Sequence, residues 1–215
     1  NFNSTMVVAE YARRERIPLF FAASSSTQFL HHQDNPYTFS KCVNEEVLQL
    51  YNKIYDLEYH MLYFYNVYGP READYGEYST VVRAFKKCVE EGTPLRVFGS
   101  GRKQRDFTHI HDVIDGILKL LTTKSKPRNV HLGSGNPVSI LDIAKAFDHD
   151  FIHEFDKPGE AEITECEKPY IEPSYNVIAY IKKWKQDFEE EQILHNVNKD
   201  LRKVEEKYAK IDSGQ

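Results

Sequence analysis

The first half of the chain alternates between segments with helical periodicity and short apolar runs. Positions 4–16 and 38–55 place apolar residues at intervals of three and four, which predicts two helices. Positions 17–23 and 58–67 are compact runs of aliphatic and aromatic residues, which is typical of buried strands. The stretch 24–35 is polar, so we expect a loop between the first strand and the second helix.

The second half repeats this alternation with shorter elements. Strands alternating with helices predict an α/β fold. The expected helix 139–147 carries Ser139 as a cap with Asp142 three positions later. Gly92 has the position of a left-handed helix cap. The other expected elements are helices at 78–90 and 113–121, strands at 96–98, 106–110, 129–132 and 151–155, and a charged helical segment at 176–210, in one or two pieces.

Composition bounds the class of protein. The chain has 215 residues, 40% hydrophobic and 28% charged, which suits one domain or slightly more. Its three cysteines are widely spaced, so we expect a reducing, cytoplasmic location and no disulfide frame. A net charge of −5 offers no basic surface for nucleic acid. No apolar run approaches the roughly 20 residues that cross a membrane.

The pair His109 and His111 is the arrangement most suggestive of a metal. On the predicted strand 106–110 the two imidazoles would share one face, because Ile110 separates them. A zinc site needs further ligands at a fitting spacing, and none follows. We therefore expect polar surface histidines and no metal.

Tyr37 and Lys41 form the first candidate for chemistry. They are four positions apart on a predicted helix, so their side chains share one face. An ammonium near a phenol favours the phenolate, and a phenolate can accept a proton from a sugar hydroxyl. The same spacing occurs by chance on many helix surfaces, so its weight depends on its neighbours.

Three consecutive hydroxyls, Ser24, Ser25 and Ser26, follow the first predicted strand. In open α/β sheets, ligands bind at the carboxyl ends of the strands. A hydroxyl there can hydrogen-bond a reacting oxygen and exchange a proton with a base such as Tyr37. Taken alone, a serine triplet is equally a plain loop or a helix cap.

A glycine-bounded block at 99–107 ends in Arg105 and Asp106. An arginine in such a loop can direct two hydrogen bonds to a diphosphate. Asp106 could orient Arg105 or cap a turn. The alternative is a surface hairpin with a structural Arg–Asp pair.

Taken in order, these blocks resemble the extended short-chain dehydrogenase/reductase family, in its NAD-dependent epimerase/dehydratase branch, with the UDP-galactose 4-epimerases as nearest type. The opening Asn-Phe-Asn-Ser-Thr at 1–5 is also similar to the family pattern. The resemblance spans about 1–184. The blocks are Ser-Ser-Ser at 24–26, Pro-Tyr-x-x-Ser-Lys at 36–41, Tyr-Asn-Val-Tyr-Gly-Pro-Arg at 65–71, the block at 99–107, and Asn-Val-His-Leu-Gly-Ser-Gly at 129–135.

The resemblance implies a partial Rossmann-like parallel sheet, with its N-terminal half missing, and a small C-terminal substrate-binding region. The core would comprise 1–71 and 106–135, and the substrate region 72–105 and 136–188. Residues 189–215 would form a charged helical tail.

The resemblance also implies roles for matched positions. Lys157 stands where the family often has arginine, so a phosphate contact there would lose the planar fork. The implied catalytic residues are Ser26, Tyr37 and Lys41; the implied cofactor-binding residues are Tyr37, Lys41, Phe64 and Tyr65; the implied substrate-binding residues are Asn1, Asn66, Phe98, Arg105 and Lys157.

Three features depart from the family pattern. The chain has no Gly-x-x-Gly-x-x-Gly run, so we expect NAD binding, with NADP left open, to be weak or absent in this chain alone. We expect a fragment of a longer chain, a partner chain that completes the sheet, or lost cofactor binding. Ser26 and Tyr37 are only 11 positions apart (37 − 26), which is shorter than usual. Thr27 and Gln28 replace the Asp-Glu pair of dehydratases, which disfavours a 4,6-dehydratase.

The sequence thus predicts an NAD-dependent nucleotide-sugar epimerase, with a UDP-hexose as substrate and a transient keto sugar. One alternative is a catalytically silent remnant or subunit that binds a nucleotide sugar. Another is a nucleotide-sugar reductase or an ADP-heptose-type 6-epimerase. The family commonly dimerises through two helices per subunit, here 4–16 and 38–55; otherwise these helices only cover the sheet.

Overall fold

The computed structural model describes residues 2–29, 35–73 and 79–212, with side chains as far as Lys203. Within these ranges β1 (Leu19–Ser24), β2 (Tyr59–Phe64) and β7 (Asn129–Leu132) form a parallel sheet in the order β1-β2-β7. The register pairs Ser24 with Phe64 and Phe64 with Leu132. The carboxyl ends of all three strands therefore meet at one edge.

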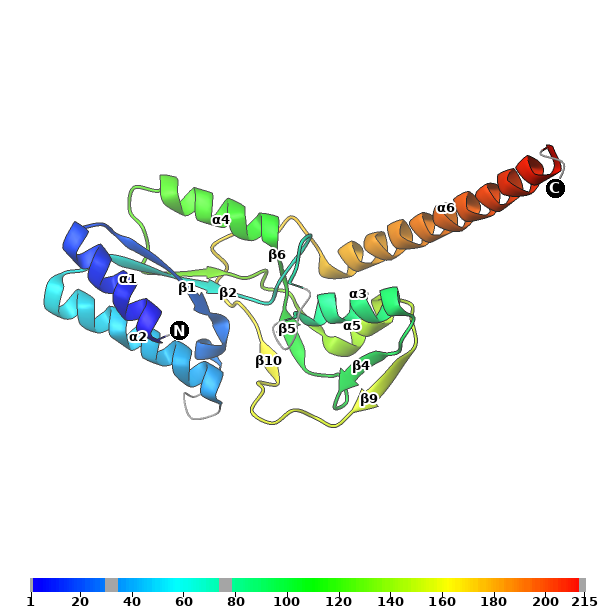
Figure 1. Ribbon diagram of the computed structural model, residues 1–215. Helices are drawn as coiled ribbons and strands as arrows, with labels where there is room; N and C mark the ends of the chain where they lie inside the picture. Colours follow the sequence, from blue (N-terminus) through cyan, green and yellow to red (C-terminus); the bar gives the residue numbers. More distant parts are fainter. Residues whose placement is uncertain (1, 30–34, 74–78, 213–215) are drawn as a thin grey trace.

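Helices cover both faces of this sheet (Figure 1). The helices α1 (Phe2–Glu15) and α2 (Pro36–Tyr55) lie together on one face, and α4 (Ile110–Thr122) lies on the other. Alternate residues of β2 divide between the two sides: Met61 and Tyr63 pack toward α1 and α2, and Leu62 packs toward α4. This double burial explains why β2 is an unbroken apolar run.

A second core joins α3 (Val81–Glu91), β4 (Leu95–Phe98), α5 (Ile140–Ala146), β9 (Phe151–Glu154) and the first turns of α6 (Val177–Asp212). The strands β4 and β9 pair in parallel. Local caps set the helix limits. Thr80 caps α3, which ends at the left-handed Gly92 (φ 65°), and Ser139 caps α5 by accepting from the Asp142 amide. The last two match the sequence prediction.

Short strands connect the two cores. The strand β3 (Val67–Tyr68) pairs with β6 (Thr108–His109), and β5 (Gln104–Asp106) lies between β8 (Pro137–Ser139) and β10 (Ile163–Thr164). Neither β8 nor β10 was expected from the sequence. Both are too short to show a period, and their pairing with β5 defines them.

Four sequence expectations need correction. The loop expected at 24–35 begins with a 3-10 turn, η1 (Ser25–Gln28). The strand expected at 58–67 is divided between β2 and β3, and that at 106–110 between β5 and β6. The helix expected at 176–210, in one or two pieces, is confirmed as a single continuous helix. His109 and His111 do not share a strand face, because His109 caps α4 and His111 lies in its first turn.

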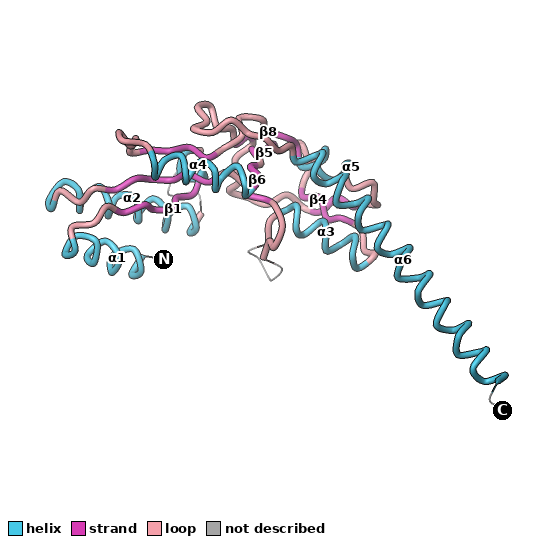
Figure 2. Tube along the Cα trace, turned by 90° about the horizontal axis from the view of Figure 1, so that it is seen from above, coloured by secondary structure: helices cyan, strands magenta, loops and turns pink. Residues whose placement is uncertain are grey.

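The helix α6 projects from the body of the molecule, as Figures 1 and 2 show. None of the described helices is long and apolar enough to cross a membrane. The α/β class with a parallel sheet is confirmed.

Candidate active site

A cavity of about 530 Å³ opens where β1 and β2 end. Ser26 comes from η1, which directly follows β1, and Phe64 ends β2. Tyr37 and Lys41 reach the same cavity from the first turns of α2. Ser26, Tyr37, Lys41 and Phe64, predicted from separate sequence blocks, therefore line one space.

The serine triplet is ordered by its own hydrogen bonds. The Ser24 and Ser26 hydroxyl oxygens are 2.9 Å apart, and the Ser26 amide donates to Ser24 Oγ at 3.3 Å. Ser24 thereby caps η1. All three serines line the cavity. Sequence reasoning selected Ser26, whereas the structure brings Ser24 to the cavity as well.

The start of α2 sets the direction of Tyr37. Asn35 caps the helix by accepting from the Thr38 amide at 2.8 Å, and Pro36 occupies the first turn. Tyr37 is 55% exposed, so its phenol is accessible from the cavity. The Lys41 ammonium lies 5.6 Å from the centre of the Tyr37 ring.

Glu45 lies one further turn along α2, behind the serines, and sequence reasoning missed it. Its carboxylate accepts from Thr27 Oγ1 at 2.6 Å and from the Tyr63 hydroxyl at 3.1 Å. Burial raises the pKa of Glu45, and the two hydrogen bonds act in the opposite direction. The spacing of Glu45 from Tyr37 and Lys41 could have identified it, since positions 37, 41 and 45 fall on one helix face.

A second cavity of about 560 Å³ adjoins the first. Phe98, at the end of β4, forms part of its wall, and the Lys157 ammonium lies 4.0 Å from the centre of the Phe98 ring. Asn66, Arg105 and Glu160 line both cavities. The two spaces therefore form one elongated site with these three residues at its middle.

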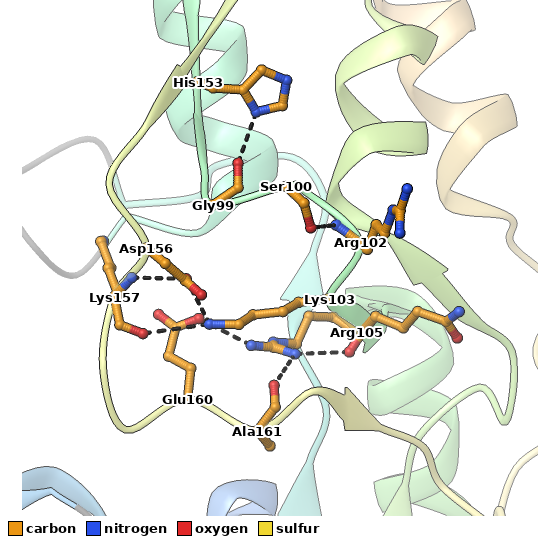
Figure 3. Close-up of polar contacts among 11 residues, drawn as sticks. Gly99, Ser100, Arg102, Lys103, Arg105, His153, Asp156, Lys157, Glu160 and Ala161 are labelled. Carbon is orange, nitrogen blue, oxygen red and sulfur yellow. Dashed lines mark hydrogen bonds and ion pairs between the residues drawn. The ribbon is translucent and has the colours of Figure 1, made fainter.

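Arg105 is held at this junction by β10 and by the residues that immediately precede that strand (Figure 3). Its guanidinium donates to Glu160 at 3.0 Å and to the Ala161 carbonyl at 2.8 Å. The expected partner, Asp106, lies elsewhere: it is fully buried and accepts from the amides of Ser134, Gly135 and Cys166 at 2.8–2.9 Å. The structural Arg–Asp pair is thus absent among the described contacts, and Asp106 caps a turn instead.

Tyr65 does not reach the main cavity. It is 2% exposed, and its hydroxyl lies 2.9 Å from His131 Nδ1, beside a separate cavity of about 270 Å³. Burial raises its pKa above the usual range for tyrosine. Asn1 lies outside the described residues.

The expectation of surface histidines is wrong for His109. Its ring is buried and stacks on Tyr175 at 3.9 Å between centres, whereas His111 is exposed. Burial lowers the pKa of His109. No cluster of three or more histidine, cysteine or acidic side chains suited to a metal occurs in the described ranges.

The main cavity also suits the reacting end of a nicotinamide cofactor. Ala22, Ala23 and Phe64 supply apolar lining for a flat ring, and Tyr37 and Lys41 supply polar groups to the same cavity. The described residues therefore fit the nicotinamide and its ribose. The rest of the cofactor would need a glycine-rich phosphate cradle, which these 215 residues do not contain.

Comparisons with known proteins give the family of this chain. Residues 1–133 match the model of the NAD dependent epimerase/dehydratase family. A candidate UDP-glucose 4-epimerase of Methanocaldococcus jannaschii is 35% identical over 133 residues, which is 60% of this chain and 43% of that protein. The chain spans about half the length of the curated relatives it matches.

Solved structures share the fold. UDP-glucose 4-epimerase from Thermotoga maritima, with UDP-glucose, superposes with a TM-score of 0.74 at 20% identity, over 87% of this chain and 69% of that one. UDP-glucuronic acid 4-epimerase from Bacillus cereus, with UDP-glucuronic acid and NAD, gives 0.70 at 23% identity, over 85% and 67%. The Rossmann-like α/β arrangement is therefore established.

Proposed function

The chain belongs to the NAD-dependent epimerase/dehydratase family, and from this premise we propose that its main cavity is the reaction site of a nucleotide-sugar epimerase. One observation carries the proposal. The hydroxyls of Ser24 and Ser26, the phenol of Tyr37 and the ammonium of Lys41 line a single cavity at the carboxyl ends of β1 and β2. Ligands of open α/β sheets bind at this edge.

In the proposed reaction, Tyr37 accepts the proton of a sugar hydroxyl and later returns it. Lys41 lies one turn away and places a cation beside the phenol. Ser24 or Ser26 donates a hydrogen bond to the same sugar oxygen, because their mutual contact uses only one of the two hydroxyl hydrogens. When bound, NAD supplies the acceptor and donor of hydride.

The cofactor would be held by residues already in place around the cavity. Tyr37 and Lys41 suit the nicotinamide ribose, and Phe64 suits the nicotinamide ring. Because the sequence has no glycine-rich cradle, we expect NAD or NADP to bind this chain weakly by itself.

The second cavity suits the nucleotide. Phe98 and Lys157 present a ring and a cation for the base and phosphates. Arg105 and Asn66, between the two cavities, are placed for the diphosphate. The Glu160 carboxylate accepts a hydrogen bond from the Arg105 guanidinium. A diphosphate would therefore have to displace that carboxylate to bind Arg105. These roles fit a UDP-hexose.

Epimerisation is favoured over dehydration by the residues that follow the serines. A dehydratase needs an acid and a base there, and the chain has Thr27 and Gln28. The Thr27 hydroxyl already donates to Glu45 and contacts the Ser24 carbonyl. Neither side chain can move a proton on and off the sugar carbon.

We also propose that α1 and α2 form a homodimer contact. Their outer faces expose Val7 at 69%, Tyr11 at 60%, Leu50 at 51% and Ile54 at 57%. Apolar faces of this kind on two adjacent helices are typical of an association surface.

The test is turnover by the full chain with added NAD or NADP. Purified protein is incubated with UDP-glucose, and UDP-galactose is followed by chromatography. We expect conversion in the wild type and a loss of about 100-fold or more in Tyr37→Phe, with binding of UDP-glucose retained in calorimetry. Tyr55→Phe, at an exposed tyrosine that ends α2 and lines neither cavity, is the matched control. No conversion with either cofactor, or full activity in Tyr37→Phe, would contradict the proposal; binding without conversion would favour a binding subunit.

A further inference from the structure

The loop 155–162, which joins β9 to β10, passes the middle of the elongated site. Lys157 and Glu160 from this loop line the second cavity, and Glu160 also lines the main cavity. The Arg105 guanidinium holds the end of the loop through Glu160 and the Ala161 carbonyl (Figure 3). The position of this loop therefore decides where the charged groups at the middle of the site stand.

Asn35 ties this loop to the start of α2. Its Nδ2 donates to the Gly159 carbonyl at 3.2 Å, while its Oδ1 accepts from the Thr38 amide at 2.8 Å. Gly159 directly precedes Glu160 in the chain. Among the described residues, this is the one hydrogen bond that joins the loop to α2 or its cap. A single side-chain amide thus connects the loop to the catalytic helix.

The two halves of the Asn35 amide do different work. The oxygen caps α2, which an aspartate or a serine at the same position does equally well. The nitrogen contributes nothing to the cap, because it donates to a carbonyl of a distant segment. Asn35 lines neither cavity, so this donor does not contact a ligand in either of them. Its effect on a ligand must pass through the loop.

We propose that Asn35 is a positioning residue that transmits occupation of the nucleotide site to the first turn of α2; this inference rests on the proposed nucleotide-sugar site. A diphosphate that takes Arg105 from Glu160 repositions the loop at Gly159, and a phosphate on Lys157 orders it. An ordered Gly159 carbonyl holds the Asn35 amide, and the amide holds the cap two positions before Tyr37. Binding energy from the non-reacting part of the substrate is then used to place the reacting phenol.

Hydrogen exchange in the first turn of α2 measures this coupling. The amides of Thr38 and Phe39 both donate to Asn35, to its side chain and its carbonyl respectively. With UDP at a saturating concentration, set beforehand by calorimetry, we expect their exchange in the wild type to slow by about 5-fold or more. UDP alone carries no sugar to the phenol, so the effect reports on the nucleotide site.

Asn35→Asp and Asn35→Ser keep the cap and remove the donor. Without UDP, we expect exchange at Thr38 and Phe39 in both variants to stay within about 2-fold of the wild type. With UDP, the slowing is expected to be lost in both. The serine variant adds no negative charge near the phosphates, so it separates loss of the donor from electrostatic repulsion. Circular dichroism checks that both variants remain folded.

Asn176→Asp is the matched control. Asn176 caps the start of α6 in the same way, since its Oδ1 accepts from the Ala179 amide at 3.1 Å, and it lines neither cavity. The same exchange of asparagine for aspartate at this cap is expected to leave the effect of UDP on α2 intact.

Turnover gives a second readout. In Asn35→Ser we expect kcat for UDP-glucose to fall by about 10-fold while KM changes by less than about 2-fold, because the interaction positions the phenol and does not hold the substrate. An unchanged kcat would show that the bridge does not position Tyr37 and would overturn the inference.

The outcomes separate this inference from the proposed function. UDP that binds the wild type without slowing exchange in α2, or that slows it equally in Asn35→Asp and Asn35→Ser, overturns the inference and leaves the nucleotide site standing. A wild type that does not bind UDP overturns both. The exchange measurement involves no hydride transfer, so absence of epimerase turnover does not affect it.

Discussion

The ammonium of Lys41 lies 5.6 Å from the centre of the Tyr37 ring, one turn further along α2. The Asn35 cap and Pro36 hold the first turn of that helix in place. The cation therefore has a defined position beside the phenol and within the main cavity.

Replacement of Lys41 by methionine removes the cation and keeps most of the side-chain length. We expect epimerase turnover to fall by about 10-fold or more, because the cation beside the reacting phenol is lost. The Kd for UDP-glucose, measured by calorimetry, is expected to stay close to the wild-type value, which a collapsed cavity would not allow. Lys53→Met, an exposed lysine on the same helix, is the control. Full turnover in Lys41→Met would contradict the assignment.

Arg105→Lys tests the junction of the two cavities. A lysine keeps the charge but cannot direct two parallel hydrogen bonds to a diphosphate. We expect the Kd for UDP, measured by calorimetry, to rise by about 10-fold, or about 1.4 kcal/mol. Arg102→Lys, at an exposed arginine that lines neither cavity, is expected to leave the Kd unchanged. Equal effects of the two substitutions would argue against a specific contact.

Asp106→Asn tests a buried structural hub. The Asp106 carboxylate accepts from three backbone amides and from the Ser134 hydroxyl at 2.6 Å. The NH2 group of an asparagine side chain would face backbone N–H groups that have no acceptor there. We therefore expect the free energy of unfolding, measured in urea, to fall by about 2–4 kcal/mol. Asp115→Asn, on the exposed side of α4, should change it by less than about 0.5 kcal/mol. An unchanged midpoint in Asp106→Asn would refute this role.

Glu45 is expected to give the fold a pH dependence. Burial raises its pKa above the ordinary value of 4.5, so the native state binds the proton more tightly than the unfolded chain does. Its contribution is fully present below about pH 4.5 and is lost as the pH rises through the raised pKa. Between pH 4 and 7, the stability of the wild type should therefore fall relative to Glu45→Gln. Urea unfolding at several pH values measures this difference.

The exposed Glu46, next along α2, provides the control for that series. Glu46→Gln removes a carboxyl from the same helix and leaves the Glu45 hydrogen bonds in place, so its curve should run parallel to that of the wild type. A Glu45→Gln curve that also runs parallel would show that Glu45 does not titrate differently on folding.

Local patterns were sufficient for most of the secondary structure. The strand at 129–132 has the expected bounds, and Gly92 and Ser139 end and begin their helices as their residue types suggest. These features depend on backbone preferences and on hydrogen bonds within a few residues, which the sequence displays directly.

The position of Tyr65 could have been predicted from the alternation of side chains along a strand. Neighbouring residues of an extended chain point to opposite sides, so Phe64 and Tyr65 were poor candidates for the same cavity wall. The structure places Phe64 in the main cavity and Tyr65 against His131. The burial of His109 could not be predicted from local sequence, because it depends on Tyr175, which is distant in sequence.

The sequence by itself determined the α/β class, the succession of helices and main strands, and the ordered blocks that resemble the family. Only the tertiary structure decided that Glu45 supports the serine turn and that Arg105 pairs with Glu160. It also decided that Leu194, Val197 and Leu201 of α6 (Val177–Asp212) are exposed. The physical reason is the separation along the chain between the residues that interact. Periodicity and caps report on interactions within a turn or two, whereas these contacts join residues from separate elements, or depend on what the rest of the chain leaves exposed.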